Sequence, residues 1–270
     1  MTKKTLFRSY FLFLAVVSSF LSSCEDLVDV KIEEGKSQLA VDAVLTNKPI
    51  PQVIKLTKTI GYFNNKFAPP VLNATVIVTD NEGKRYEFTD PDKDGRYTWT
   101  PKQGEVFGEI GKTYQLYINA EGEEYEAYSQ MRRIPRIDSI YLERRKARPA
   151  LNEPAGIYAE LFVRDLKGPG DCYWIRTYKN GIFLNKPQEI GLSYDGAFSA
   201  GTAFDGLTFI RPVREFINPV RDEKDPADQA PYNIGDSIYV DLLSITPEMW
   251  FYMLNLQEQL QNGGLFATPV

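Results

Sequence analysis

The stretch Ala74–Thr89, ATVIVTDNEGKRYEFT, decides the fold class of this chain. Its first half places Val76 and Val78 on one side, with Ile77 and threonines on the other, and its second half alternates aromatic and charged residues. Alternation with period two is typical of a β-strand that is buried on one face. The four residues between the halves, DNEG at 80–83, supply the residue types of a tight turn. The stretch therefore predicts an antiparallel hairpin.

The same alternation recurs before and after this hairpin in short segments that are separated by turn residues. We expect strands at residues 39–45, 53–59, 74–79, 86–89, 97–100, 113–119 and 125–130. The loop DKDG at 92–95 leads from one hairpin into the next, as in an antiparallel meander. This spacing of short strands predicts a β-sandwich domain over residues 38–132.

Residues 133–270 are predicted to form a second β-rich domain. Strands are expected at 137–144, 158–164, 172–178 and 237–244, with long irregular loops over 181–218 and a surface loop over 218–232. Thr246-Pro247-Glu248 predicts the start of a helix over about 247–262, with Thr246 as its N-cap. Apolar residues at helical spacing, from Met249 to Leu260, favour packing of this helix on a core over a binding groove. The printed sequence ends on apolar residues, LFATPV at 265–270, and we expect the natural chain to continue beyond them.

The first 23 residues have the three parts of an export signal peptide: a basic start, an apolar run over 10–21, and two small serines. Leu21-Ser22-Ser23-Cys24 then matches a lipoprotein processing site. Cleavage would leave Cys24 first, with a diacylglycerol on its sulfur and a further acyl chain such as palmitate on its amine. The apolar run is shorter than the roughly 20 residues of a spanning helix. An ordinary cleaved signal peptide and an uncleaved anchor remain as alternatives, and the acidic residues that follow Cys24 predict a tether over 24–37.

The charge balance argues against a nucleic-acid partner. The chain has 31 Lys and Arg residues against 36 Asp and Glu, and removal of the signal peptide would leave 28 against 36. Nucleic-acid binding needs a strong local excess of basic residues. The densest basic cluster is interrupted by acids, so we interpret it as a solvated strand and linker in preference to a partner-binding patch. Its members are Arg132, Arg133, Arg136, Arg144, Arg145, Lys146 and Arg148.

The catalytic residue types are sparse. The chain has no histidine, which removes the Ser-His-Asp and Cys-His pairings and the zinc sites that use histidine. Gly111-Lys112-Thr113 resembles the end of a phosphate loop, but Val106 stands where the first glycine would be needed, so no nucleotide is expected. Of the two cysteines, Cys24 is assigned to lipid, and Cys172 is expected to be a buried, inert strand residue.

Two sets of residues are candidates for ligand contacts. Asp90, Asp92 and Asp94 alternate before a glycine and form a weak calcium candidate, although Pro101 replaces the closing glutamate and a hairpin turn is favoured. Beyond this candidate we expect no metal and no cofactor. The second set contains aromatic residues of the glycine-rich segment, which would stack on a ligand if they are exposed and would otherwise belong to the core. These are Tyr194, Phe198, Phe204 and Phe209.

Several short motifs in a fixed order carry a resemblance to a known family. They are the lipoprotein site with its acidic start, ATV at 74–76, NEG at 81–83, GRY at 95–97, GKTYQL at 111–116, YEA at 125–127, PRIDSI at 135–140, the helix at Thr246, and NGGLFATP at 262–269. The chain resembles the domain-of-unknown-function 4249 family over nearly all of its mature length. That resemblance implies outer-membrane lipoproteins of Bacteroidota that act beside TonB-dependent receptors. It also implies an immunoglobulin- or transthyretin-like sandwich followed by a second β-rich domain, and it supplies no catalytic residues.

These observations predict a lipid-anchored protein of the outer membrane that faces the cell surface. We expect a non-catalytic accessory or ligand-binding module that works with a TonB-dependent transporter in nutrient uptake. Two alternatives remain open: a structural or assembly protein of the cell envelope, and a hydrolase that uses carboxylates alone.

Overall fold

The computed structural model describes residues 35–61, 64, 66–151, 153–199, 202–222 and 229–261. The chain divides into two units, residues 1–38 with 59–68, and residues 39–58 with 69–270. In the first unit, the Ser37 hydroxyl donates a 2.9 Å hydrogen bond to the Thr59 carbonyl. The predicted signal peptide, Cys24, most of the tether and the last nine residues lie outside the described residues. The predicted boundary between residues 132 and 133 remains a prediction.

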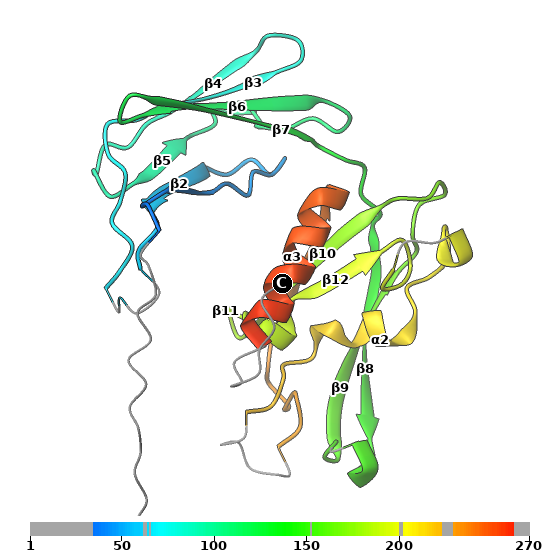
Figure 1. Cartoon of the computed structure of the whole chain (residues 1–270). Coiled ribbons are helices and arrows are strands. Elements are labelled where there is room, and N and C mark those ends of the chain that lie inside the picture. Colours follow the sequence, from blue (N-terminus) through cyan, green and yellow to red (C-terminus); the bar gives the residue numbers. More distant parts are fainter. Residues whose placement is uncertain are drawn as a thin grey trace, which may run out of the picture. The chain divides into compact units, whose positions relative to one another are not determined.

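The second unit begins with two antiparallel sheets, and the mostly β fold predicted from the alternation is confirmed (Figure 1). A three-stranded sheet has the order β1-β2-β5, and a four-stranded sheet has the order β4-β3-β6-β7. The strands are β1 (Leu39–Asp42), β2 (Gln52–Lys58), β3 (Thr75–Asp80), β4 (Arg85–Phe88), β5 (Arg96–Trp99), β6 (Thr113–Ala120) and β7 (Glu123–Gln130). Each predicted strand of residues 38–132 therefore exists, with ends that shift by a few residues.

The turn of the β3–β4 hairpin forms as its sequence predicts. The backbone N–H of Gly83 donates to the Asp80 carbonyl at 2.9 Å, and the Asp80 carboxylate accepts the N–H groups of Glu82 and Lys84. Gly83 has a φ of 88°, a conformation that glycine adopts without steric cost. The hairpin pairs Val76 with Phe88 and so fixes which face of both strands is buried.

One hydrophobic core lies between these two sheets. Ile54 and Leu56 of β2 are fully buried and meet Val76 and Val78 of β3 in the same cluster. Phe107 lies at the centre of an aromatic group, with ring centroids 4.7 Å from Tyr86 and 5.3 Å from Tyr114. This two-layer arrangement is consistent with a sandwich.

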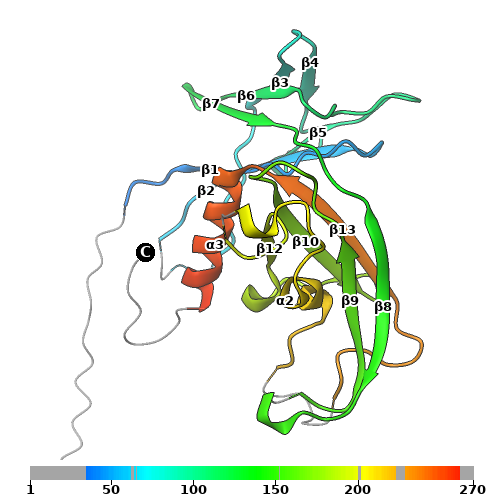
Figure 2. The ribbon, with the colours of Figure 1, turned by 90° about the vertical axis from the view of Figure 1, so that its right-hand side faces the viewer.

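A second group of strands follows from residue 137. β8 (Ile137–Arg145) pairs with β9 (Gly156–Val163), and β10 (Cys172–Lys179) lies between β13 (Ile238–Ile245) on one side and β12 (Gly191–Tyr194) and β11 (Ile182–Phe183) on the other. Figure 2 shows β12, β10 and β13 side by side. The prediction of irregular loops across 181–218 was wrong in part, because β11, β12 and the short helix α2 (Arg211–Arg214) lie there. This part of the chain also has four short 3-10 helices: η1 (Pro149–Leu151), η2 (Pro187–Glu189), η3 (Thr202–Phe204) and η4 (Glu215–Ile217).

The two faces of β10 carry separate cores. Tyr173 and Ile175 pack with Leu161 of β9 in one cluster, whereas Cys172 packs with Trp250 in the other. Cys172 is fully buried, as predicted, and this burial raises the pKa of its thiol to about 12 and keeps it protonated.

The late helix α3 (Pro247–Gln261) covers the second face of β10. The hydroxyl of Thr246 accepts the backbone N–H of Met249 at 3.2 Å, so the predicted N-cap is confirmed. Trp250 and Met253 are buried as the helical stripe predicts, whereas Leu260 is 54% exposed. Among the described residues, no helix is long and apolar enough to cross a membrane.

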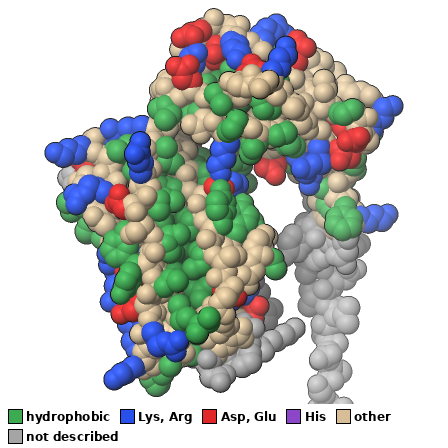
Figure 3. Space-filling model, turned by 180° about the vertical axis from the view of Figure 1, so that it is seen from behind, with side chains coloured by type: hydrophobic (Ala, Val, Ile, Leu, Met, Phe, Trp, Pro, Cys, Tyr) green, Lys and Arg blue, Asp and Glu red, His purple; other side chains and the backbone are tan. Residues whose placement is uncertain are grey.

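β8 differs from the other strands because its outer edge is unpaired and apolar side chains are exposed on both of its faces. Within the described part of the chain it pairs with β9 alone. Tyr141 and Leu142 are 58% and 54% exposed. Figure 3 shows apolar side chains gathered on the lower body of the molecule, which contains this second group of strands. We call Ile137, Tyr141 and Leu142 the β8 apolar edge.

Candidate functional site

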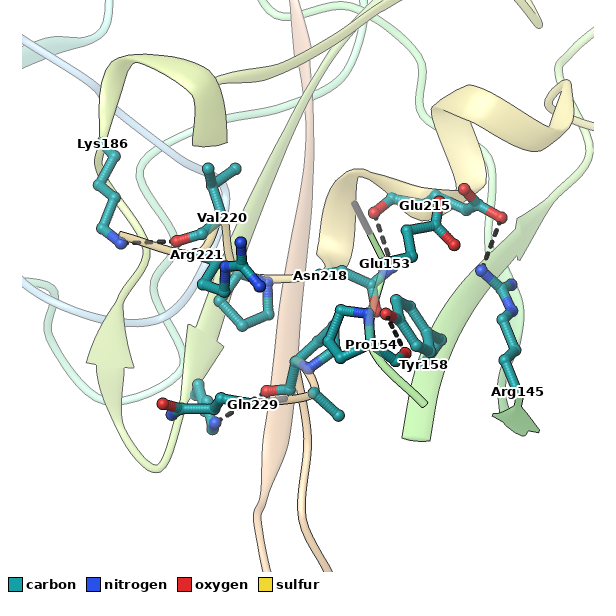
Figure 4. Close-up of a pocket in the computed structure, with 14 residues that line it drawn as sticks. Arg145, Glu153, Pro154, Tyr158, Lys186, Glu215, Asn218, Val220, Arg221 and Gln229 are labelled. Carbon is teal, nitrogen blue, oxygen red and sulfur yellow. Dashed lines mark hydrogen bonds and ion pairs between the residues drawn. The ribbon is translucent and has the colours of Figure 1, made fainter. Parts of the chain in front are cut away.

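A pocket of about 310 Å³ lies where the ends of β8, β9 and β10 meet the segment that follows α2 (Figure 4). Its charged lining residues are Arg145, Lys179, Lys186, Arg221, Glu153 and Glu215. Tyr158 and Asn218 contribute neutral polar groups, and prolines form much of the remaining wall. This is the size of a small ligand site, and the question is whether its charges are free to bind one.

Arg145, the last residue of β8, is the buried cation of the pocket. Its guanidinium donates to Glu143 at 2.8 Å and to Glu160 at 2.7 Å, and it forms a 3.0 Å ion pair with Glu215. The guanidinium carbon also lies 4.9 Å from the centroid of the Tyr158 ring. Burial opposes the charge, but the hydrogen bond to Glu143 and the nearby carboxylates raise the pKa of Arg145. The side chain is therefore a fixed charge that is already neutralised by protein groups.

Glu160 is the buried anion of the same network. It stands on β9 with 7% of its surface exposed, and its carboxylate also lies 3.4 Å from Arg211 and 3.4 Å from Arg214 of α2. Because α2 packs on β9, these arginines reach the outer face of that strand. The network joins the end of β8, the middle of β9 and α2, and it is built to hold these elements together.

Asn218 fastens the segment after α2 to the edge of β9. Its side-chain amide donates to the carbonyl of Ala159 and accepts the N–H of Ala159, both at 2.8 Å. A single side chain thus replaces one residue of a neighbouring strand and satisfies the backbone groups at that edge. This contact positions the wall of the pocket that runs from Glu215 to Arg221.

The two lysines of the pocket are held by the backbone of the opposite wall. Lys179 donates to the Pro231 carbonyl at 2.8 Å and forms a 3.2 Å ion pair with Asp236. Lys186 donates to the Val220 carbonyl at 2.6 Å and pairs with Asp222 at 3.0 Å. An anionic ligand would have to displace these partners. The pocket therefore has the electrostatics of a structural network more than of a prepared anion site.

Comparison with known proteins supplies a family but no function. The model of a family described as a domain of unknown function, DUF4249, matches residues 25–270. The chain belongs to this family. No curated protein and no solved structure matches the chain.

The predicted aromatic contacts do not form one site. Phe209 is 1% exposed and packs 5.5 Å from the Tyr173 ring, so its assignment as a ligand contact was wrong. Tyr194 is half-buried and packs edge-on against Trp250 in the core under α3. Phe198 and Phe204 are 43% and 40% exposed, and Phe198 contacts the ring of Phe216. Only these two of the four remain accessible to a ligand, and they do not line the pocket.

The three aspartates of the calcium candidate lie in a turn between β4 and β5. The Asp90 carboxylate accepts the N–H groups of Asp94 and Gly95, and the Asp94 carboxylate accepts the N–H of Arg96. These bonds make the tight turn that the sequence favoured over a metal loop. Among the residues whose placement is described, no group of three His, Cys, Asp or Glu side chains could hold a metal ion.

The sequence patterns did not indicate the pocket of this DUF4249 protein. The basic cluster of residues 132–148 was interpreted as solvated, and that interpretation was wrong for Arg145, which is buried. Arg133 forms a bidentate pair with the buried Asp171, but its own side chain is 44% exposed, as predicted. The one local sign was Glu143, which shares a strand face with Arg145, whereas the pairing with Glu160 depends on the register between β8 and β9.

Proposed function

We propose that this protein is a lipid-anchored outer-membrane lipoprotein, faces the cell surface, and acts as a non-catalytic accessory or ligand-binding module of a TonB-dependent transporter. The observation that carries the proposal is the lipoprotein site at residues 21–24 behind a basic and apolar leader. Glu25 and Asp26 directly follow the cysteine and support placement on the outer face, as the family resemblance implies for lipoproteins of Bacteroidota.

The chemistry of the body supports binding over catalysis. The chain has no histidine, and the two acids of the pocket are engaged in ion pairs, Glu153 with Arg148 and Glu215 with Arg145. A carboxylate hydrolase would need an acid and a base that are free to exchange protons with a substrate. The pairing of Glu153 and Glu215 weighs against that alternative.

The β8 apolar edge supports a protein partner. A strand with an unpaired edge and exposed apolar side chains is a common site of contact with another protein, and monomeric proteins rarely leave such surface uncovered. Tyr141 and Leu142 are the most exposed members of this edge. We place the contact with the transporter here.

The proposal is tested by affinity purification of the tagged full-length protein from membranes of the native organism in mild detergent. We expect an outer-membrane channel to be recovered with the wild type and lost with the double variant Tyr141→Glu and Leu142→Glu. Tyr252→Glu is the matched control, because Tyr252 lies on α3 and is 59% exposed. Recovery of the wild type without any outer-membrane channel, or with envelope-assembly proteins in its place, would overturn the accessory role.

A further inference from the structure

The outer face of the sheet β4-β3-β6-β7 carries a group of polar and aromatic side chains that the pocket does not include. In Figure 1 this face points away from β2 and β5. Tyr114, Ile118 and Ala120 of β6 point into the core, so Gln115, Tyr117 and Asn119 point outward. On β7, the residues paired with these three are Tyr128, Glu126 and Glu124.

Hydrogen bonds between the two strands hold both tyrosines across the sheet. The Tyr117 hydroxyl donates to Glu124 at 2.8 Å, and Asn119 donates to the same carboxylate at 3.5 Å. The Tyr128 hydroxyl accepts from Gln115 at 2.8 Å and donates to Glu126 at 3.1 Å. Because each hydroxyl is tied to the neighbouring strand, each ring has to extend over the sheet and present a face to solvent. Tyr128 is 65% exposed, whereas Tyr117 is only partly exposed.

The two tyrosines occupy diagonal positions on this face. Tyr117 is paired with Glu126, and Tyr128 follows two residues later on the same side of β7. Such diagonal positions of an antiparallel pair are about 7–8 Å apart, within reach of aromatic side chains. The rings thus form a small platform flanked by two amides and two carboxylates. We call Gln115, Tyr117, Asn119, Glu124, Glu126 and Tyr128 the tyrosine platform.

We propose that the tyrosine platform binds a neutral polysaccharide. The exposed ring faces can pack against the C–H faces of sugar rings, and amide and carboxylate groups supply the mixed donors and acceptors that neighbouring sugar hydroxyls need. The platform lies on the open face of a sheet, which suits an extended polymer better than a small enclosed ligand.

Charge selects against an anionic polymer. The outward side chains of β4 and β7 include Glu87, Glu124 and Glu126 against the single Arg85, so an anionic polymer would be repelled. The hydrogen bonds to the platform carboxylates raise the pKa of Tyr117 and of Tyr128, so both hydroxyls remain donors. A cationic peptide is the competing ligand, because a carboxylate that accepts a tyrosine hydroxyl keeps its charge, and poly-L-lysine tests that alternative.

This inference deepens the proposed binding role by naming the ligand class, and its test is independent of the transporter. The full-length protein in mild detergent is titrated calorimetrically with soluble mixed-linkage β-glucan, xyloglucan, galactomannan and an α-glucan. At least one should bind. The double variant Tyr117→Ala and Tyr128→Ala should lose about tenfold or more of the affinity, as expected for removal of the central aromatic contacts.

Three further measurements make the result decisive. Tyr252→Ala removes an equally exposed tyrosine from α3 and should leave binding unchanged. Tyr128→Phe retains the ring and should retain most of the affinity, and it serves as the second variant if the double variant has a lowered melting temperature. Polygalacturonate and poly-L-lysine test the anionic and cationic alternatives, and neither should bind through the tyrosines.

Absence of binding to all four neutral polymers would overturn the proposal, as would unchanged binding by the double variant or tyrosine-dependent binding of poly-L-lysine. These outcomes leave the recovery of an outer-membrane channel unaffected. Conversely, loss of that channel with intact polysaccharide binding would refute the transporter role alone.

Discussion

The two groups of strands are stabilised in different ways. Among the described residues, the sheets from β1 to β7 bury only two polar or charged side chains, Gln52 and Asp80. The region from β8 to α3 buries eight, and five of them are acids. The first region therefore depends mainly on apolar burial, whereas the second also depends on buried carboxylates that have to keep their partners.

Two buried acids of the second region accept hydrogen bonds from other loops and strands. Asp195 accepts the backbone N–H groups of Gly170 and Asp171, at 2.8 and 2.9 Å. Asp165 accepts the hydroxyl of Tyr173 at 2.6 Å and the N–H of Gly206 at 3.0 Å. These bonds tie the loop between β9 and β10 to the segment after β12. Their loss would loosen several elements together.

Arg145→Ala should break the second region most severely. It leaves Glu160 buried beside only the more distant arginines of α2, and we expect a loss of about 3–5 kcal/mol in the free energy of unfolding, as for other broken buried pairs. Urea unfolding followed by tryptophan fluorescence measures the change. Arg144→Ala is the control, because Arg144 is an exposed neighbour on the same strand. Equal effects of the two variants would contradict the structural role of the network.

Tyr97→Phe should lower the stability of the first region, because it removes a buried hydroxyl that bonds to residues far away in the sequence. The Tyr97 hydroxyl donates to the Val71 carbonyl and accepts the N–H of Ala74, both at 2.9 Å. The variant leaves both backbone groups unpaired, and we expect a loss of about 1–3 kcal/mol. Tyr117→Phe, whose hydroxyl is on the surface, should change the same urea midpoint little. A Tyr97→Phe effect within error of this control would show that water replaces the hydroxyl.

Thr246→Ala should destabilise the second region by about 1 kcal/mol, because it removes the N-cap of α3. Circular dichroism during thermal unfolding is the measurement. Thr246→Ser keeps the capping oxygen and should recover most of the loss. If both variants melt together below the wild type, the cap is not the cause.

The smallest expected effect is a difference between the two regions in how their stability depends on pH. For Asp80, burial alone would raise the pKa, but the N–H groups of Lys84 and Glu82 and the charge of Lys112 lower it overall. A lowered pKa gives stability that is present above the unfolded value of about 4 and is lost as the pH falls below it. For Asp165, burial raises the pKa, so its contribution declines as the pH rises above about 4.

Asp80→Asn should therefore reduce the loss of stability that occurs as the pH falls below about 4. Asp165→Asn should reduce the loss of stability that occurs as the pH rises above about 4. Urea midpoints measured across the acid range test both variants against the wild type. Identical pH profiles for the two variants would contradict the opposite signs.

The comparison also explains what the sequence could predict. Each strand of the first region was expected, because the alternating residues of β3 and β4 face a mainly apolar core and the turn at residues 80–83 has typical turn residues. Thr246 and α3 were likewise predicted from local signals. β12 was missed, since Gly191 opens it and its pairing with β10 is set by long-range register. The Arg145 network was missed for the same reason, because Glu160 and Glu215 lie in other elements.

The candidate sites likewise could be predicted only where the signal is local in the sequence. Exposure of an aromatic residue depends on tertiary packing. Phe209 and Phe198 both lie in glycine-rich sequence, so the sequence alone could not show that Phe209 is buried and Phe198 exposed. The tyrosine platform likewise depends on the pairing of β6 with β7, which places Tyr117 and Tyr128 together. By contrast, the lipoprotein site at residues 21–24 is a local motif and can be recognised without a structure.

Attachment of lipid at Cys24 is the central claim, and metabolic labelling with an alkyne analogue of palmitate tests it most directly. The two cysteines supply a matched pair, since Cys172 is buried and Cys24 precedes the folded body. We predict label on the wild type and on Cys172→Ala, and neither label nor membrane association for Cys24→Ala. An unlabelled wild type, or label that persists in Cys24→Ala, would contradict the account.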